Sequence, residues 1–315
     1  MKKISIILIL LFPLLLGNVM AQSRKYIGHF SGFQSYYNPS LVGFGGNSFN
    51  SLVRSQWGGI QGAPKTIFGS LEGDLDQITG ADSIGLVGKN AMGLFIMYDE
   101  HGPFTETELM LNYTNRVQLS ENHLLGLGVG VKYLNTELDG TRLTPEQSDD
   151  PSLGRYLGGF ADTKFFDLNL GVALLHKKYY LAYSMQNMAS GKLSSGDDFY
   201  TERPPIYNFQ AGYRGVVSDK VGLITNFVYR LQKNLPYQAE FNVKALLMEK
   251  VWVGIGHRLE YATSLQTGFL MDRFKVGYLY EMSTKSRNKM YGSTHEFMAS
   301  VRLFDKGDKG IFGLW

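Results

Sequence analysis

The histidines of this sequence are the side chains best suited to catalysis, because a histidine beside a serine and a carboxylate can activate a nucleophile. They are widely scattered. His123 and His176 fall in predicted turns and His101 in a short predicted loop, while His257 and His295 lie on predicted strands, on the same side as apolar residues. The chain contains no cysteine, which excludes thiol catalysis and thiolate metal sites. We therefore predict no catalytic residue and a protein that is not an enzyme.

Two further patterns are compatible with ligand chemistry but lack the context it needs. Gly126, Gly128 and Gly130 repeat like a phosphate-binding loop, yet they lie inside a predicted strand with no helix after it. Carboxylates that could bind calcium gather around one long connection, without the fixed spacing of a known site: Asp139, Glu146, Asp149, Asp150 and Asp162. We predict no cofactor and no metal site.

Contact with a partner is the chemistry that remains, and residues in connections are the best placed for it. Two candidates flank a hairpin that Gly58-Gly59 and Ala63-Pro64 punctuate, and three are aromatic residues of longer connections. The candidates are Trp57, Lys65, Phe160, Phe199 and Tyr200. The hairpin pair also has a plainer interpretation, in which both side chains only anchor the turn.

The elements that position these residues follow from an alternation of apolar and polar residues after residue 48. Between Leu125 and Tyr133 every second residue is a large apolar one, and glycine or lysine fills the other positions. Because successive side chains of a strand point to opposite faces, this pattern predicts strands with one apolar face. Turn residues separate about fourteen such stretches: 49–57, 64–75, 90–99, 104–119, 124–135, 164–175, 178–188, 205–216, 219–231, 237–247, 250–260, 262–271, 273–283 and 290–304.

A soluble sandwich and a membrane barrel would both alternate, but they differ in where charges and long connections fall. A charge that faces lipid at mid-bilayer costs about 2–4 kcal/mol, and here the charged residues share the parity of the polar ones: Arg54, Glu72, Glu108, Arg116, Lys132, Asp167, Arg214, Arg230, Glu240, Lys244, Arg258, Lys275, Glu281, Glu296 and Arg302. Tight connections alternate with long ones along most of the chain. The sequence therefore predicts an all-β, transmembrane outer-membrane β-barrel with both termini in the periplasm.

One connection does not fit this asymmetry. Residues 76–89 fall on the predicted periplasmic side, yet they form a long connection. Either this segment folds over the periplasmic mouth or it contains an irregular strand that the alternation misses.

The N-terminus predicts export. Lys2 and Lys3 precede an apolar run that ends in a small-residue cleavage pattern, so residues 1–21 are predicted to be a signal peptide. Without the two lysines of this segment, twenty-nine basic residues face twenty-eight acidic ones, a balance that argues against nucleic-acid binding. Residues 22–48 show no clear strand and are predicted to be a periplasmic or plug-like segment, with an unrecognised hairpin as the alternative. Residues 49–304 are then the barrel and 305–315 a periplasmic tail.

Several stretches, in order along the chain, resemble the PorP/SprF family. An Asn38-Pro39 entry is followed by Gln56-Trp57 and by Gly62-Ala63-Pro64-Lys65, and the last predicted strand contains Thr294-His295-Glu296. Further similar stretches are 98–103 and 252–258. The sequence departs from the family pattern at Ser40 and Val42 in the Asn-Pro stretch. It also continues beyond Phe304, so the residue that serves as the C-terminal assembly signal of the barrel stays open.

The resemblance implies a non-enzymatic barrel of the type IX secretion system and gliding machinery of Bacteroidetes. Such a barrel would assist secretion or surface anchoring of large proteins, such as adhesins with C-terminal sorting domains. The implied partners are outer-membrane lipids, secretion-system subunits and a secreted surface protein. A passive channel for small or hydrophobic solutes is the alternative, because a barrel of this predicted size could enclose a lumen.

Overall fold

The computed structural model describes residues 27–60, 62–80, 88–143, 154–197, 199, 203–284 and 292–304. The predicted signal peptide, residues 22–26 of the predicted plug-like segment and the predicted tail 305–315 lie outside these ranges, and so does Tyr200. Within the described ranges, no helix combines the length and the apolar character needed to cross a membrane.

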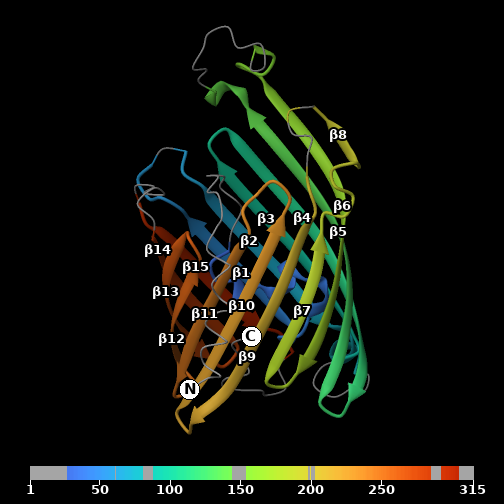
Figure 1. Cartoon of the computed structure of the whole chain (residues 1–315), viewed down its shortest axis with the longest axis vertical. Helices are drawn as coiled ribbons and strands as arrows, with labels where there is room; N and C mark the ends of the chain where they lie inside the picture. Colours follow the sequence, from blue (N-terminus) through green and yellow to red (C-terminus); the bar gives the residue numbers. More distant parts are fainter. Residues whose placement is uncertain are drawn as a thin grey trace, which may run out of the picture.

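Fourteen antiparallel strands form a closed barrel (Figure 1). Each barrel strand pairs with its neighbour in the chain, and β1 pairs with β15, which closes the ring. A three-residue strand, β8 (Ser194–Gly196), adds to the edge of β6 outside this ring. The barrel strands are β1 (Ser48–Ser55), β2 (Lys65–Asp74), β3 (Asn90–His101), β4 (Phe104–Ser120), β5 (His123–Asp139), β6 (Phe160–His176), β7 (Tyr179–Gln186), β9 (Ile206–Ser218), β10 (Val221–Gln232), β11 (Gln238–Leu247), β12 (Val251–Arg258), β13 (Ala262–Met271), β14 (Phe274–Ser283) and β15 (Thr294–Arg302).

The predicted number of strands and the predicted barrel are confirmed. Every predicted range overlaps one barrel strand. The ends differ by up to four residues: β5 extends to Asp139 and β6 starts at Phe160, beyond the predicted ranges 124–135 and 164–175, and β15 starts at Thr294 rather than at 290.

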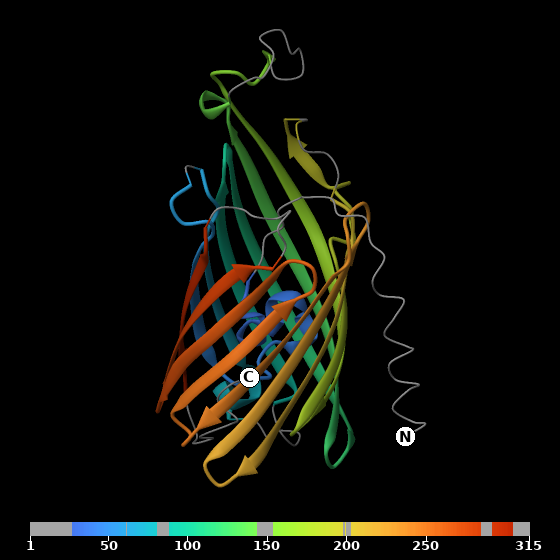
Figure 2. The same cartoon turned by 60° about the vertical axis from the view of Figure 1, so that its left-hand side comes forward.

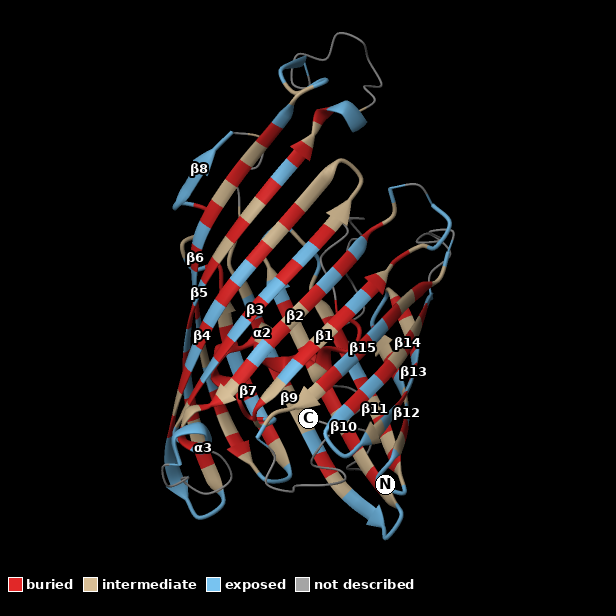
Figure 3. Ribbon diagram, turned by 180° about the vertical axis from the view of Figure 1, so that it is seen from behind, coloured by how far each residue is buried: buried red, intermediate tan, exposed pale blue. Residues whose placement is uncertain are grey.

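Exposed and buried residues alternate along the strands, as Figure 3 shows. On β5, Val129 is 52 % exposed whereas Lys132, on the opposite parity, is 5 % exposed. All the charged residues predicted to face inward are buried except Arg302, which is half-buried at the end of β15. The predicted orientation is thus correct, and the apolar outer face suits lipid.

The barrel wall is taller on one side. Strands β4, β5 and β6 have 17 residues each, whereas β1, β7 and β12 have 8. The long strands β5 and β6 carry residues 140–143 and 154–159 well above the rest of the rim (Figure 1). Because long connections are typical of the outer end of such barrels, we call this the outer end, and we call the opposite end, where the short turns lie, the periplasmic end.

The connection after β2 contains a helix and, in its described part, no strand. Helix α3 (Leu75–Thr79) begins at Asp74, whose carboxylate accepts from the Gln77 backbone amide at 3.2 Å. The Asp76 carboxylate accepts from the backbone amides of Lys89 and Asn90 and so ties the helix to the start of β3. The described residues of this connection thus contain no irregular strand, and residues 81–87 lie outside the described ranges.

Residues 27–47, here called the luminal segment, lie within the ring of strands (Figure 2). They form the short helices η2 (Phe30–Gly32), α2 (Gln34–Tyr37) and η3 (Pro39–Leu41) and contain no strand, so the alternative of a hairpin is wrong for these residues. Their aromatic side chains form a core with inward-facing residues of the wall. Phe33, for example, packs edge-on against Phe68 of β2, with the two ring centroids 5.1 Å apart.

Candidate functional site

The luminal segment and the inward-facing side chains around it form the most elaborate polar site among the described residues. On one side of the barrel, five strands supply a buried ion network. Arg54 of β1 donates to Glu296 of β15 at 3.1 Å and to Glu281 of β14 at 3.0 Å. Arg258 of β12 donates to Glu281 and to Glu240 of β11, both at 2.9 Å. Because each carboxylate has a cationic partner, the network is compensated although it lies out of water.

This network also holds the luminal segment. The Glu296 carboxylate accepts from the backbone amides of Gly28 at 2.8 Å and His29 at 2.7 Å, and from His29 Nδ1 at 2.6 Å. Burial lowers the pKa of His29 below its usual 6.5, so the ring is neutral near pH 7 and carries its proton on Nδ1 to donate to Glu296. Lys244 of β11 adds a bond to the Ser31 hydroxyl at 2.8 Å.

On the other side of the barrel, wall side chains bond to the backbone of the luminal segment. Its carbonyl groups cannot all pair within such short helices, and an unpaired buried carbonyl is costly. Polar side chains of β4, β7 and β9 donate to them instead: Asn112 to Ser35, Thr114 to Pro39, Arg116 to Val42, Ser184 and Asn208 to Tyr37, Gln186 to Tyr36 and Gln210 to Gln34. The wall is thus matched to the path of this segment.

Glycines of β5 and β6 make room for the turn at Asn38–Ser40. A Cβ at Gly128 would lie 2.2 Å from Ser40 N and 2.4 Å from the Pro39 carbonyl carbon, and a Cβ at Gly171 would lie 2.0 Å from Asn38 Oδ1. The same Asn38 oxygen accepts from Ser40 N at 2.9 Å and stabilises the turn. Gly126 and Gly128 of the glycine repeat therefore permit close approach of a second backbone, whereas Gly130 faces the Asn112 side chain.

The predicted contact residues do not form one cluster. Trp57 is half-buried at the end of β1 and Lys65 is exposed at the start of β2. Phe160 is 81 % exposed at the start of β6. Phe199 stacks on Phe104 of β4, with ring centroids 6.4 Å apart. Among the described residues, no hydrogen bond or ring contact joins the hairpin pair to the two phenylalanines.

The predicted histidines and acidic residues are likewise spread over the described part of the chain. His257 and His295 lie half-buried at outer strand ends and bond to the hydroxyls of Thr263 and Tyr278. In the parts of the chain that are described, no three His, Asp or Glu side chains are placed to hold a metal ion. Of the acidic loop, Glu146, Asp149 and Asp150 lie outside the described ranges.

Comparison with known protein families shows that one family model matches most of the chain. The model of the family described as type IX secretion system membrane protein PorP/SprF matches residues 19–301. No curated protein matches the chain.

Solved outer-membrane barrels share a general outline with this chain. Acinetobacter baumannii Omp33 is 10 % identical with a TM-score of 0.45, over 82 % of this chain and 98 % of that one. The Pseudomonas putida toluene transporter TodX is 10 % identical with a TM-score of 0.47, over 89 % of this chain and 94 % of that one. The CymD monoaromatic hydrocarbon channel is 12 % identical with a TM-score of 0.47, over 89 % of this chain and 93 % of that one. The strand pairing described above, rather than this distant likeness, establishes the barrel.

Proposed function

Since this chain belongs to the PorP/SprF family of type IX secretion system membrane proteins, we propose that it is an accessory barrel of that system in the outer membrane. It assists secretion of large surface proteins or holds them at the outer rim, and its lumen stays closed to solutes. In this proposal residues 1–21 direct export, and residues 22–48 become the plug of a barrel formed by 49–304, with 305–315 as a periplasmic tail.

The observation that carries the proposal is the occupied lumen. The luminal segment bonds to inward-facing side chains from strands on both sides of the barrel, including Glu296 and Ser184. Each such bond contributes about 0.5–1.5 kcal/mol, and breaking it leaves buried polar groups without partners. Opening a solute path through the lumen would therefore cost several kcal/mol. This cost favours a closed accessory barrel over the passive channel.

The tall side of the wall is the surface that we assign to the cargo or to a secretion subunit. Aromatic side chains are enriched where proteins bind one another, and here Phe160 projects from β6 at 81 % exposure. Phe199 stacks on Phe104 and also contacts Tyr156 of the connection between β5 and β6, with the ring centroids of Phe199 and Tyr156 5.9 Å apart. The chemistry fits a large exported protein, such as an adhesin of the gliding machinery, that docks from outside.

The test is purification of the tagged barrel from its native outer membrane in gentle detergents, with co-purifying proteins identified by mass spectrometry. We expect one large exported surface protein or secretion-system subunits to co-purify. Phe160→Ser should leave barrel abundance unchanged and reduce that recovery several-fold. The matched control is Val217→Ser, which replaces an exposed apolar residue at the opposite end of the barrel.

Two results would overturn the proposal. A barrel that purifies alone in every detergent has no stable partner. Solute flux through the reconstituted barrel, independent of any other protein, would establish the channel instead. Trp57→Ala separates anchoring from contact at the hairpin, because loss of an interfacial anchor lowers barrel abundance whereas loss of a contact lowers only partner recovery.

A further inference from the structure

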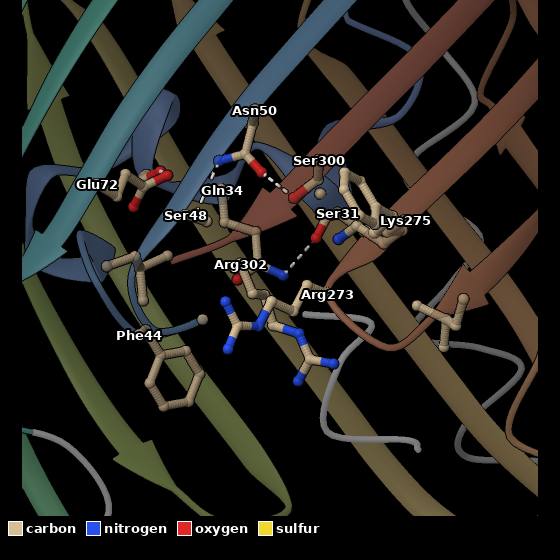
Figure 4. A pocket seen from close by; sticks show the side chains of 16 residues that line it. Ser31, Gln34, Phe44, Ser48, Asn50, Glu72, Arg273, Lys275, Ser300 and Arg302 are labelled. Carbon is tan, nitrogen blue, oxygen red and sulfur yellow. Dashed lines mark hydrogen bonds between the residues drawn. The ribbon is translucent and has the colours of Figure 1, made fainter. Parts of the chain in front are cut away.

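A small pocket opens beneath the luminal segment, at the periplasmic end of the barrel (Figure 4). It has a volume of about 40 Å³, enough for a group of a few heavy atoms. Gln34 and Phe44 are among the residues of the luminal segment that line it. The wall contributes the starts of β1 and β14 and the end of β15, together with the tight turn between β13 and β14.

Three cationic side chains point into this space: Arg273 from the tight turn, Lys275 from β14 and Arg302 from the end of β15 (Figure 4). Arg273 is exposed and Arg302 half-buried, with one Arg302 Nη atom donating to the Asp272 carbonyl. The neutral polar groups of the lining pair with one another; Asn50, for example, accepts from Ser300 at 2.6 Å and donates to Ser48 at 3.0 Å. The pocket thus presents mainly positive charge.

The pocket contains one carboxylate, which already has partners. Glu72 of β2 accepts from the Ser35 hydroxyl at 2.7 Å through one oxygen and from the Gly43 backbone amide at 3.1 Å through the other. Both bonds hold the luminal segment. Glu72 therefore serves that segment first, and its single charge stands against three cations.

Lys275 points most directly to a ligand. It is 8 % exposed, and among the described residues no hydrogen bond or ion pair engages its amine. The other inward-facing lysines of the strands differ in this respect, because Lys244 donates to Ser31 at 2.8 Å and Lys132 lies 3.9 Å from a Glu108 oxygen. The amine nitrogen is not one of the fully enclosed polar atoms, so it opens onto the pocket, whereas an enclosed amine without an acceptor would be unfavourable. The amine is placed to bind an acceptor that enters the pocket.

We propose that this pocket binds a carboxylate of an acidic polypeptide segment that reaches the barrel from the periplasm. Two guanidinium groups and an amine around a small cavity suit an oxyanion, because arginine can bind a carboxylate through two parallel hydrogen bonds. We favour a polypeptide carboxylate over a lipid phosphate because Lys275 and Arg302 lie on the inner parity of the strands, away from the bilayer. Val276, on the outer parity, faces lipid there, whereas the exposed Phe274 also borders the pocket. The site concerns the periplasmic end and does not depend on what docks at the outer rim.

The experiment measures binding of a fluorescent peptide to the full-length barrel in neutral detergent by fluorescence anisotropy. The probe is a hexapeptide rich in Asp and Glu, and the reference is the amidated peptide with Asn and Gln in their place. We expect the acidic peptide to bind at least tenfold more tightly than the neutral one. Lys275→Gln and Arg273→Gln should each weaken its binding about tenfold, and added salt should weaken it further.

Lys233→Gln is the matched control, since Lys233 is an exposed lysine between β10 and β11, at the opposite end of the barrel, and its replacement should leave binding unchanged. Arg273 is exposed in a turn, so its variant keeps the test valid even where Lys275→Gln lowers the yield of folded barrel. Equal binding of acidic and neutral peptides, or full binding by both pocket variants, overturns the proposal. Competition by inorganic phosphate or acetate at the peptide's own concentration identifies a free-anion site, and competition by anionic lipid vesicles a lipid site; either result also overturns it.

Discussion

Replacing Gly128 by alanine tests whether the barrel wall and the luminal segment are built to fit each other. The added Cβ would lie 2.2 Å from Ser40 N, 2.4 Å from Pro39 C and 2.6 Å from Ser40 Cα, whereas ordinary contacts of a Cβ begin at 3.4 Å. All three atoms belong to backbone, so no side chain can rotate away. The turn must move by about 1.2 Å, the difference between 3.4 Å and 2.2 Å, or β5 must bend outward.

The energetic cost follows from what this movement disrupts. Overpacking of a closely packed site costs about 1–3 kcal/mol. A shift of this size also takes the Pro39 carbonyl away from the Thr114 hydroxyl that donates to it, and a buried bond broken in this way costs about 1–3 kcal/mol more. Because partial relaxation offsets some of the total, we expect Gly128→Ala to lower the free energy of unfolding by about 2–4 kcal/mol.

Urea titration of the barrel in lipid vesicles, followed by tryptophan fluorescence, measures this change. Chymotrypsin provides a second readout, because Phe30, Phe33 and Tyr37 of the luminal segment are buried and become cleavable only where the segment leaves its place. The control is Gly69→Ala, whose Cβ would meet Ile96 Cγ2 at an ordinary 3.4 Å. Equal stability and equal protection for the two variants would refute the close fit.

Two further predictions concern the ion network. Arg54→Met leaves Glu281 and Glu296 with one cationic neighbour fewer and should lower the free energy of unfolding by about 3–5 kcal/mol in the same titration. The control Arg142→Met, at an exposed ion pair, should leave the free energy of unfolding unchanged. Equal effects of both variants would contradict a stabilising role of the buried ion network. Burial lowers the pKa of His29 below 6.5, so the unfolded chain binds a proton at this ring more readily than the folded chain. The free energy of unfolding should therefore fall as the pH drops from about 6.5 towards 5, and the fall should be smaller in His29→Gln. An identical pH dependence in the wild-type and variant proteins would contradict a neutral buried ring.

The strands and their orientation could be predicted because two environments act on the two faces of every strand. Val129 and Lys132 must face apart, since lipid excludes the charge and a polar lumen accepts it. A shift of one residue would reverse both side chains, so the parity of each stretch is strongly specified. The extensions of β5 to Asp139 and of β6 back to Phe160 were missed because they rise beyond the lipid, where the apolar face is no longer required.

The path of the luminal segment could not be predicted in the same way. Its short helices η2, α2 and η3 have no period long enough to recognise, and its conformation depends on groups far away in the chain. Glu296, for example, bonds to His29 across 267 positions of sequence. The glycine at position 128 was visible as a pattern, but only the structure shows that a turn fills the space in front of it.

Charged residues on the inner parity have two possible surroundings, and sequence alone does not separate them. In a water-filled lumen they are solvated, and each can be replaced at little cost. Here Arg54 is 1 % exposed and Glu296 is not exposed at all, so protein groups have taken the place of water. A buried charge depends on its partners, and one of these partners, His29, belongs to the luminal segment. Withdrawing that segment would expose or strand the charges that now bind it, and for this reason the barrel and the segment should fold as one cooperative unit.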